Sequence, residues 1–202
     1  MIAYDRLGFG KSDANHAKLP LDFIAKEAGN DFTTVRQQLD IGKFILFGHS
    51  VGGGIAVNCA ARFSEDCAAL ITESAQAFVE DRTIQCIEEA RELFKDPVQV
   101  TRLKKYHGEK AEWILEAWIN SWLSPEFASW SLKPVLLRLR CPVLVIHGID
   151  DEYGSPRHPE LIGQLAGGAP QIEIMADTGH VPHREQEGVV VDMVTDFLQS
   201  LD

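Results

Sequence analysis

The stretch Lys43-Phe44-Ile45-Leu46-Phe47-Gly48-His49-Ser50-Val51-Gly52 decides the fold. Its first half is an apolar run of strand length, which is typical of strands buried on both faces of a parallel sheet. Its second half, Gly48 to Gly52, matches the pattern G-x-S-x-G, and residues 55–63 after it are alanine-rich and predict a helix. Two glycines permit a tight turn that lifts a serine hydroxyl out between strand and helix. An ordinary glycine-rich turn is the alternative, but the flanking strand and helix favour a nucleophile at Ser50.

Two further motifs follow strand-like runs later in the chain. Residues 142–148 have the pattern of a buried strand, and Asp150 and Asp151 come directly after it. Residues 171–175 form a shorter strand pattern, and His180 follows it in a loop that contains glycine. Ligands bind beyond the carboxyl ends of the strands in open parallel sheets, so an acid and a base are expected there, beside Ser50. These positions predict an acid at Asp150 or Asp151 and a base at His180.

Four other side chains compete for these roles or lie close to them. Asp150 is the alternative acid, one residue before Asp151, and His183 is the alternative base. His49 and His147 are expected to pack or to form hydrogen bonds rather than to catalyse.

The remaining pattern alternates strands with helices, which argues for an α/β fold with a mostly parallel sheet. Residues 2–5 resemble the end of a short strand, residues 6–12 a glycine-rich loop and residues 68–72 another strand. Residues 21–39 carry apolar residues at helical spacing, interrupted near residues 29–31. We expect Asp31 to cap the second helical piece and Gly42 to end it. Residues 187–201 predict an amphipathic helix.

The chain divides into a core with one insertion. Residues 1–75 form the first part of the core, residues 76–137 a helical lid or cap, and residues 138–202 the second part. All four tryptophans fall in the insertion: Trp113, Trp118, Trp122 and Trp130. They either form the core of the lid or offer an apolar surface to a substrate.

The composition and charge of the chain restrict the classes of partner that it is expected to bind. The 202 residues have a formal net charge of −11, which disfavours nucleic acid and anionic membranes as partners. The four cysteines form no C-x-x-C pair, and Cys59 and Cys141 are expected to be buried. No signal peptide pattern is visible at the start, and no apolar run approaches the ~18 residues of a membrane span. These features favour a cytoplasmic protein.

In these motifs the chain resembles the α/β-hydrolase superfamily over its whole length. Asp5 to Ser12 looks like the D-x-x-G-x-G-x-S loop of that family, and Gly48 to Gly53 like its nucleophile elbow. Residues 141–148 with Asp151 look like the acid strand and loop, Gly179-His180 like the base loop, and the helix from Glu185 like the closing helix.

The resemblance implies a carboxylesterase-like serine hydrolase. Ser50 would attack an acyl carbon, His180 would carry the proton, and Asp151 would orient the imidazole. The elbow would use Gly48 and Gly52, and the N–H of Val51 would donate to the oxyanion. Such a site needs no cofactor and no metal, and its partner is a small, partly apolar substrate. A serine nucleophile argues against dehalogenase and epoxide hydrolase chemistry, which uses aspartate, and against dienelactone hydrolases, which use cysteine.

The same resemblance implies N-terminal strands, and a loop supplying a second oxyanion donor, that these residues do not match. We therefore expect a truncated or late-starting product. A strand ending at Asp5 would lack its neighbour, so it must detach, slide against residues 43–47, or borrow a strand from another chain in a homo-oligomer. Losing one oxyanion donor costs on the order of 10²–10³ in turnover. A catalytically impaired, hydrolase-like scaffold is therefore the alternative function.

Overall fold

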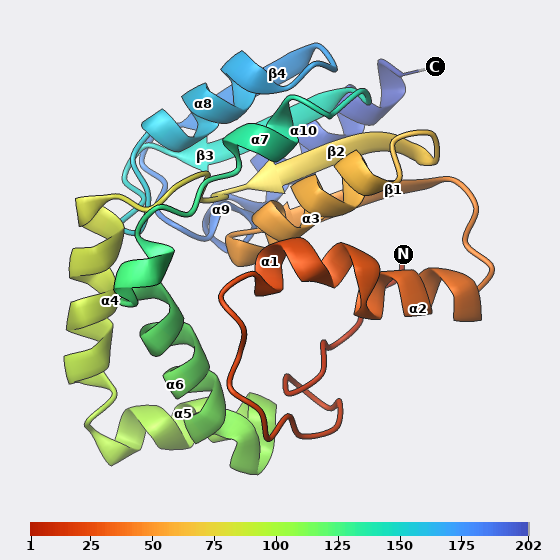
Figure 1. The fold of residues 1–202 in the computed structure, drawn as a ribbon. Helices are drawn as coiled ribbons and strands as arrows, with labels where there is room; N and C mark the ends of the chain where they lie inside the picture. Colours follow the sequence, from red (N-terminus) through yellow and green to blue (C-terminus); the bar gives the residue numbers. More distant parts are fainter. Residues whose placement is uncertain (202) are drawn as a thin grey trace.

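The computed structural model describes residues 1–201, which fold around a single four-stranded parallel sheet (Figure 1). The strand order follows the chain, β1-β2-β3-β4. The strands are β1 (Phe44–His49), β2 (Cys67–Glu73), β3 (Val143–Gly148) and β4 (Pro170–Met175). The predicted α/β class with a parallel sheet flanked by helices is therefore confirmed.

Helices cover both faces of this sheet. On one face lie α3 (Val51–Arg62), α7 (Lys133–Leu136) and α8 (Arg157–Leu165), and α10 (Glu187–Gln199) lies on the other (Figure 1). The short helix α9 (Pro182–Glu185) joins the base loop to α10. Helix α3 begins at Val51, four residues earlier than predicted, so the elbow leads directly into the helix.

Each face of the sheet has its own apolar core. Val57 on α3 packs with Leu70 and Val145 on one side, and none of the three is more than 2% exposed. On the other side, Phe197 of α10 packs with Ile71 and Leu144. Cys59 and Cys141 are buried, as expected. Successive side chains of a strand point to opposite faces of the sheet, so β2 and β3 contribute to both cores.

Strand β1 departs from the prediction that it is buried on both faces. Ile45 is 46% exposed and Phe47 is 48% exposed. Both side chains face the α10 side of the sheet, since they lie in register with Ala69 and Ile71 of β2. The apolar core beneath α10 draws on β2, β3 and β4 and leaves β1 uncovered. The prediction was wrong because a run of apolar residues does not reveal whether a helix covers it.

The N-terminal segment also differs from the prediction. Residues 2–5 are irregular and form no strand, so the first of the three expected outcomes, detachment, is the one observed. The Tyr4 hydroxyl instead donates to Glu27 Oε1 at 2.8 Å. The helical region comprises α1 (Phe23–Lys26), a 3₁₀ turn (Glu27–Gly29) and α2 (Asp31–Gln38).

Asp31 does not cap the second helical piece. It is the first residue of α2, and its carboxylate accepts from the Leu7 N–H at 3.0 Å. Helix α2 ends at Gln38, before Gly42, with Asp40 in the left-handed region at φ 48°. The Asp31 carboxylate therefore binds the glycine-rich loop instead of the N–H groups at the start of its own helix.

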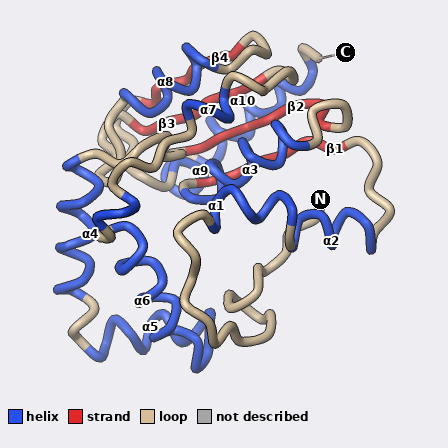
Figure 2. The backbone as a smooth tube through the Cα atoms, in the orientation of Figure 1, coloured by secondary structure: helices blue, strands red, loops and turns tan. Residues whose placement is uncertain are grey.

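The segment between β2 and β3 is helical, with α4 (Asp81–Leu93), α5 (Pro97–His107) and α6 (Ala111–Trp122) as its main elements. Figure 2 shows these helices beside the sheet, with the N-terminal loop next to α5 and α6. The loop is attached to them by hydrogen bonds: Gly10 N–H donates to His107 Nδ1 at 2.9 Å, and Trp113 Nε1 donates to the Ala17 carbonyl at 3.1 Å. The helical segment and the N-terminal loop thus form one wall beside the carboxyl ends of the strands.

Candidate active site

Ser50 occupies the sharp turn between β1 and α3. Its backbone lies at φ 54° and ψ −125°, a conformation that costs a non-glycine residue of the order of 1–3 kcal/mol. The neighbouring strand holds it there, since the Ser50 N–H donates to the Glu73 carbonyl at 2.8 Å. The turn therefore presents the serine side chain at the carboxyl edge of the sheet.

The two elbow glycines differ in their steric surroundings. A Cβ at Gly48 would lie 2.3 Å from the Gly52 carbonyl oxygen, whereas a Cβ at Gly52 would meet nothing within 4 Å. The tight approach on the helix side falls at Gly53 instead, where a Cβ would lie 2.4 Å from Ala75 Cβ. Close approach of neighbouring atoms therefore requires glycine at positions 48 and 53, whereas no neighbouring atom excludes a side chain at Gly52.

The structure brings Ser50, His180 and Asp151 into one hydrogen-bonded series. His180 Nε2 lies 3.0 Å from Ser50 Oγ, and His180 Nδ1 lies 2.9 Å from both carboxylate oxygens of Asp151. A proton on Nδ1 is donated to the carboxylate, which leaves Nε2 as the acceptor for the serine hydroxyl. This is the arrangement required of a nucleophile, a base and an orienting acid.

Asp151 is fully buried, and its charge is satisfied by hydrogen bonds. Oδ1 accepts the backbone N–H of Tyr153 at 2.8 Å and of Gly154 at 3.1 Å, in addition to His180. Burial acts to raise the pKa of Asp151, but His180, the Tyr153 N–H and His147 outweigh it and lower the pKa below its usual value of 3.8. In the folded protein at neutral pH, the Asp151 side chain is therefore ionised.

The alternative acid and base lie elsewhere. Asp150 is exposed, and only its backbone N–H is bound, by the Thr178 carbonyl at 2.9 Å. His183 Nδ1 lies 2.6 Å from Glu73 Oε2, so His183 is paired with a different carboxylate. Neither reaches the Ser50 hydroxyl.

The two carboxylate oxygens of Glu185 hold the loop that carries His180. Glu185 accepts the N–H of Gly179 at 2.7 Å and of Val181 at 2.9 Å, on either side of His180. His49 Nε2 donates to the His180 carbonyl at 2.7 Å. His147 bonds to the Gly154 carbonyl at 3.0 Å in the acid loop. His49 and His147 therefore act as hydrogen-bonding residues, as expected.

Val51 is the first residue of α3, and no hydrogen bond within residues 1–201 uses its N–H. The first N–H groups of a helix have no partner in that helix and point away from its end. This donor is therefore free next to the Ser50 hydroxyl.

Sequence reasoning missed several residues around the site. Gln76, just after β2, is 4% exposed, and its Oε1 lies 3.4 Å from Ser50 Oγ. Helix α4 clamps the acid loop, since Arg82 donates to the Asp151 carbonyl at 2.9 Å and Thr83 to the Tyr153 carbonyl at 2.6 Å. The position of Gln76 at the end of a neighbouring parallel strand was the one available signal, because such ends share an edge.

An apolar cavity of about 220 Å³ has Val51, the residue after Ser50, in its wall. The other lining residues come from the N-terminal loop, α1 and the helical segment: Arg6, Phe9, Leu19, Phe23, Phe94, Leu103, Ile114, Leu115, Trp118 and Trp122. Two of the four tryptophans line this cavity and a third packs in the apolar core. Trp118 and Trp122 face the cavity, while Trp130 stacks on Phe127, at 5.3 Å between ring centroids, within the core.

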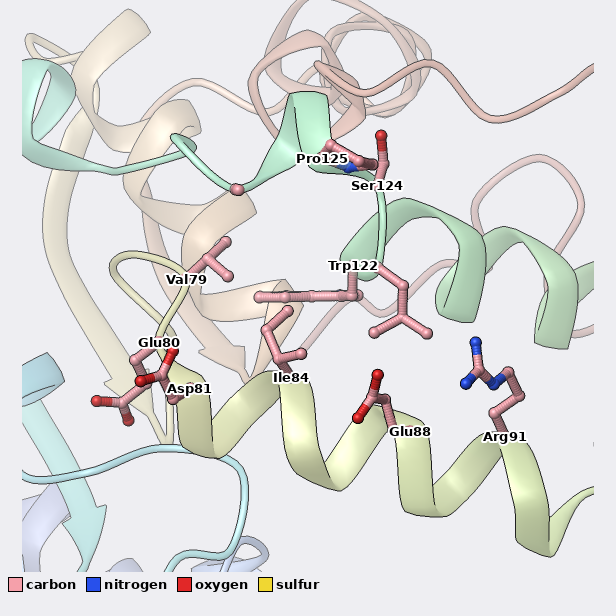
Figure 3. A pocket seen from close by; sticks show the side chains of 11 residues that line it. Val79, Glu80, Asp81, Ile84, Glu88, Arg91, Trp122, Ser124 and Pro125 are labelled. Atoms are coloured by element: carbon pink, nitrogen blue, oxygen red, sulfur yellow. The ribbon is translucent and has the colours of Figure 1, made fainter.

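A larger cavity, of about 420 Å³, lies on the far side of Trp122 between α4 and the segment after α6 (Figure 3). Charged side chains of α4 line it, among them Asp81, Glu88 and Arg91. No residue of the Ser50–His180–Asp151 series lines either cavity, but Val51, the residue after Ser50, lines the smaller one. The smaller cavity is therefore the candidate substrate site.

Residues 1–201 contain no group of three or more His, Cys, Asp or Glu side chains able to hold a metal ion. None of the helices in this range combines the length and the apolar character needed to cross a membrane.

A family model for the α/β hydrolase fold matches residues 1–102, just over half of the chain, so the chain belongs to this family. It is 24% identical to human serine hydrolase BPHL over 98% of this chain and 69% of the human protein.

Solved structures share the fold. A bacterial membrane phospholipase A superposes with a TM-score of 0.74 at 21% identity, covering 96% of this chain and 68% of the phospholipase. A thermophilic esterase from Thermogutta terrifontis superposes with a TM-score of 0.69 at 21% identity, covering 96% of this chain and 78% of the esterase. The predicted family is thus confirmed, and the relatives are hydrolases.

Proposed function

We propose that this chain is a serine hydrolase that cleaves an ester or related acyl bond of a small, partly apolar molecule through an acyl-Ser50 intermediate. The observation that carries the proposal is the hydrogen-bonded series from Ser50 Oγ through His180 to Asp151. Its serine hydrolase and esterase relatives support the same chemistry.

The steps follow from the position of each group. His180 Nε2 takes the Ser50 proton as Oγ attacks the acyl carbon, and then returns it to the leaving oxygen. Asp151 holds the imidazole in the tautomer with Nδ1 protonated and stabilises the imidazolium. A water molecule, deprotonated by His180, then attacks the acyl-enzyme, and Ser50 recovers its proton.

Charge that develops on the substrate oxygen is met by the N–H of Val51, which has no other partner within residues 1–201. Such donors stabilise the oxyanion more than the ground-state carbonyl, because they are fixed before charge develops. The substrate's apolar part would occupy the cavity lined by Trp118 and Trp122.

Hydrolysis of p-nitrophenyl acetate and butyrate by the purified chain tests the proposal, with Ser50→Ala as its control. We expect release of nitrophenol that Ser50→Ala abolishes, and labelling of Ser50 by a fluorophosphonate. A folded chain that neither turns over these esters nor reacts with the fluorophosphonate would favour the impaired, hydrolase-like scaffold.

A further inference from the structure

Arg6 is the one charged residue in the wall of the apolar cavity. It belongs to the glycine-rich loop after Asp5, and the triad makes no use of it. Its guanidinium lies over the Phe9 ring at 4.3 Å from the ring centroid and over Phe23 at 5.8 Å. The two aromatic rings fix the position of the cation beside a cavity that also reaches Val51, next to the nucleophile.

The guanidinium has no partner of its own within residues 1–201: it donates no side-chain hydrogen bond and forms no salt bridge. Arginine carries five N–H donors and stays charged, so a half-buried guanidinium without an acceptor carries a desolvation cost. Contact with aromatic faces offsets only part of that cost.

The nearest carboxylates are used elsewhere. Glu27 accepts the Tyr4 hydroxyl at 2.8 Å, and Asp31 accepts the Leu7 N–H at 3.0 Å. Burial raises the pKa of Glu27 despite the opposing effects of Tyr4 and Arg6, so the attraction of Arg6 does not offset the desolvation of Glu27. No carboxylate among the described residues therefore hydrogen-bonds to the Arg6 side chain, which lines the cavity.

We propose that Arg6 binds a carboxylate carried by the substrate, so the preferred substrates are esters with an anionic group separated from the scissile bond by a short apolar chain. This inference rests on the proposed hydrolase function. Arg6 and Val51 line the same cavity, of about 220 Å³, so one small substrate could reach both residues. The planar guanidinium matches a carboxylate with two parallel hydrogen bonds.

Matched ester pairs test the proposal. For the acyl side, mono-p-nitrophenyl hexanedioate is compared with p-nitrophenyl 6-methylheptanoate, in which an isopropyl group replaces the carboxylate. For the alcohol side, 4-acetoxybenzoate is compared with its methyl ester. We expect kcat/KM to favour the charged member of one pair by about 10-fold or more, the usual contribution of a hydrogen bond to a charged group.

Three variants assign that preference. Arg6→Met is expected to bring the ratio within the pair to about one, and Arg6→Lys to keep part of it. Arg102→Met removes the same charge from the exposed surface of α5, outside the cavity, and is expected to keep the wild-type ratio. Each ratio compares kcat/KM for two esters measured with the same variant. A general loss of activity in that variant therefore leaves the ratio unchanged.

The outcomes separate this inference from the proposed function. If wild-type protein hydrolyses the uncharged esters without preferring either charged partner, or if Arg6→Met keeps the preference, the Arg6 inference is wrong and the hydrolase function stands. If no ester is hydrolysed, hexanedioate is used as a ligand in thermal melting. A rise in Tm that Arg6→Met loses and Arg102→Met keeps supports the site, and no rise in wild type overturns it.

Discussion

Two neighbouring aspartates, Asp150 and Asp151, have opposite surroundings. Asp151 is fully buried and accepts hydrogen bonds from His180, Tyr153 and Gly154, whereas the Asp150 side chain faces solvent. The backbone turn after β3 separates them: the Asp151 N–H returns to the Gly148 carbonyl at 3.2 Å and aims its side chain inward. A difference of one position in the chain thus determines which carboxylate contacts the His180 imidazole.

This difference predicts unequal effects of the same substitution. Asp151→Asn is expected to lower kcat on an activated ester by about 10⁴, because the amide favours the wrong histidine tautomer. Asp150→Asn makes the same chemical change on the surface and is expected to stay within about threefold of wild type. Steady-state kinetics of the two variants, with circular dichroism as a check of folding, would reveal an incorrect assignment if the effects were reversed.

Buried histidines predict how stability depends on pH. Burial lowers the pKa of His147 below its usual 6.5, and its Nδ1 has no hydrogen-bond partner in the structure described. Burial also lowers the pKa of His49 and His158. Since the folded pKa lies below the unfolded one, the unfolded chain binds more protons on acidification. The stability from this source is complete above about pH 6.5 and is lost as pH falls towards the folded pKa values.

We therefore expect the free energy of unfolding in urea to decline from about pH 7.5 to about pH 5. His147→Asn should decline less steeply than wild type, because one of the protons taken up on unfolding is gone. His16→Asn, at an exposed position, is the control and should keep the wild-type slope. Equal slopes for His147→Asn and wild type would count against a role for this histidine.

Much of the site could be predicted because its residues stand in local motifs: Ser50 between glycines, Asp151 after a buried strand, His180 after Gly179. The supporting residues could not, because their partners are distant in sequence. Arg82 contacts a carbonyl 69 residues away, and Gly10 contacts a side chain 97 residues away. No short pattern encodes such contacts.

At the scale of elements, the elbow predicts a sharp difference between two glycines. Gly48→Ala places a methyl group against the Gly52 carbonyl, part of the rigid backbone at the start of α3, so we expect a loss of stability of about 2 kcal/mol or more, or a failure to fold. Gly52→Ala enters open space within the first turn of a helix and should leave stability unchanged or raise it. Urea denaturation followed by circular dichroism measures both, and similar losses would contradict the difference.

Strands and helices were predicted more reliably than their surroundings. The apolar runs located all four strands, but burial of β1 depended on a neighbour that the run itself does not encode. The Asp31 cap was wrong for a similar reason, since the loop around Leu7 competes for its carboxylate.

For the whole molecule, the uncovered side of β1 is the feature with the clearest consequence. Ile45 and Phe47 are about half exposed on a strand with a free edge, and such edges pair with other chains. We propose that copies of this chain associate through β1 and expect Ile45→Lys to reduce light scattering and apparent mass at high protein concentration. Leu137→Lys, at a position 67% exposed outside the sheet, is the control and should not. Concentration-independent behaviour of the wild type would exclude this association.

The separation of Ser50 from His180 also has a consequence for the newly made chain. They are 130 residues apart, so at about 5–20 residues per second a ribosome would synthesise the nucleophile about 7 to 26 seconds before the base. During that interval β2 emerges and can already impose the turn at Ser50 through the Glu73 carbonyl. The nascent protein would thus carry a shaped but unactivated serine, and reactivity would begin only when β4 and the loop after it join the sheet.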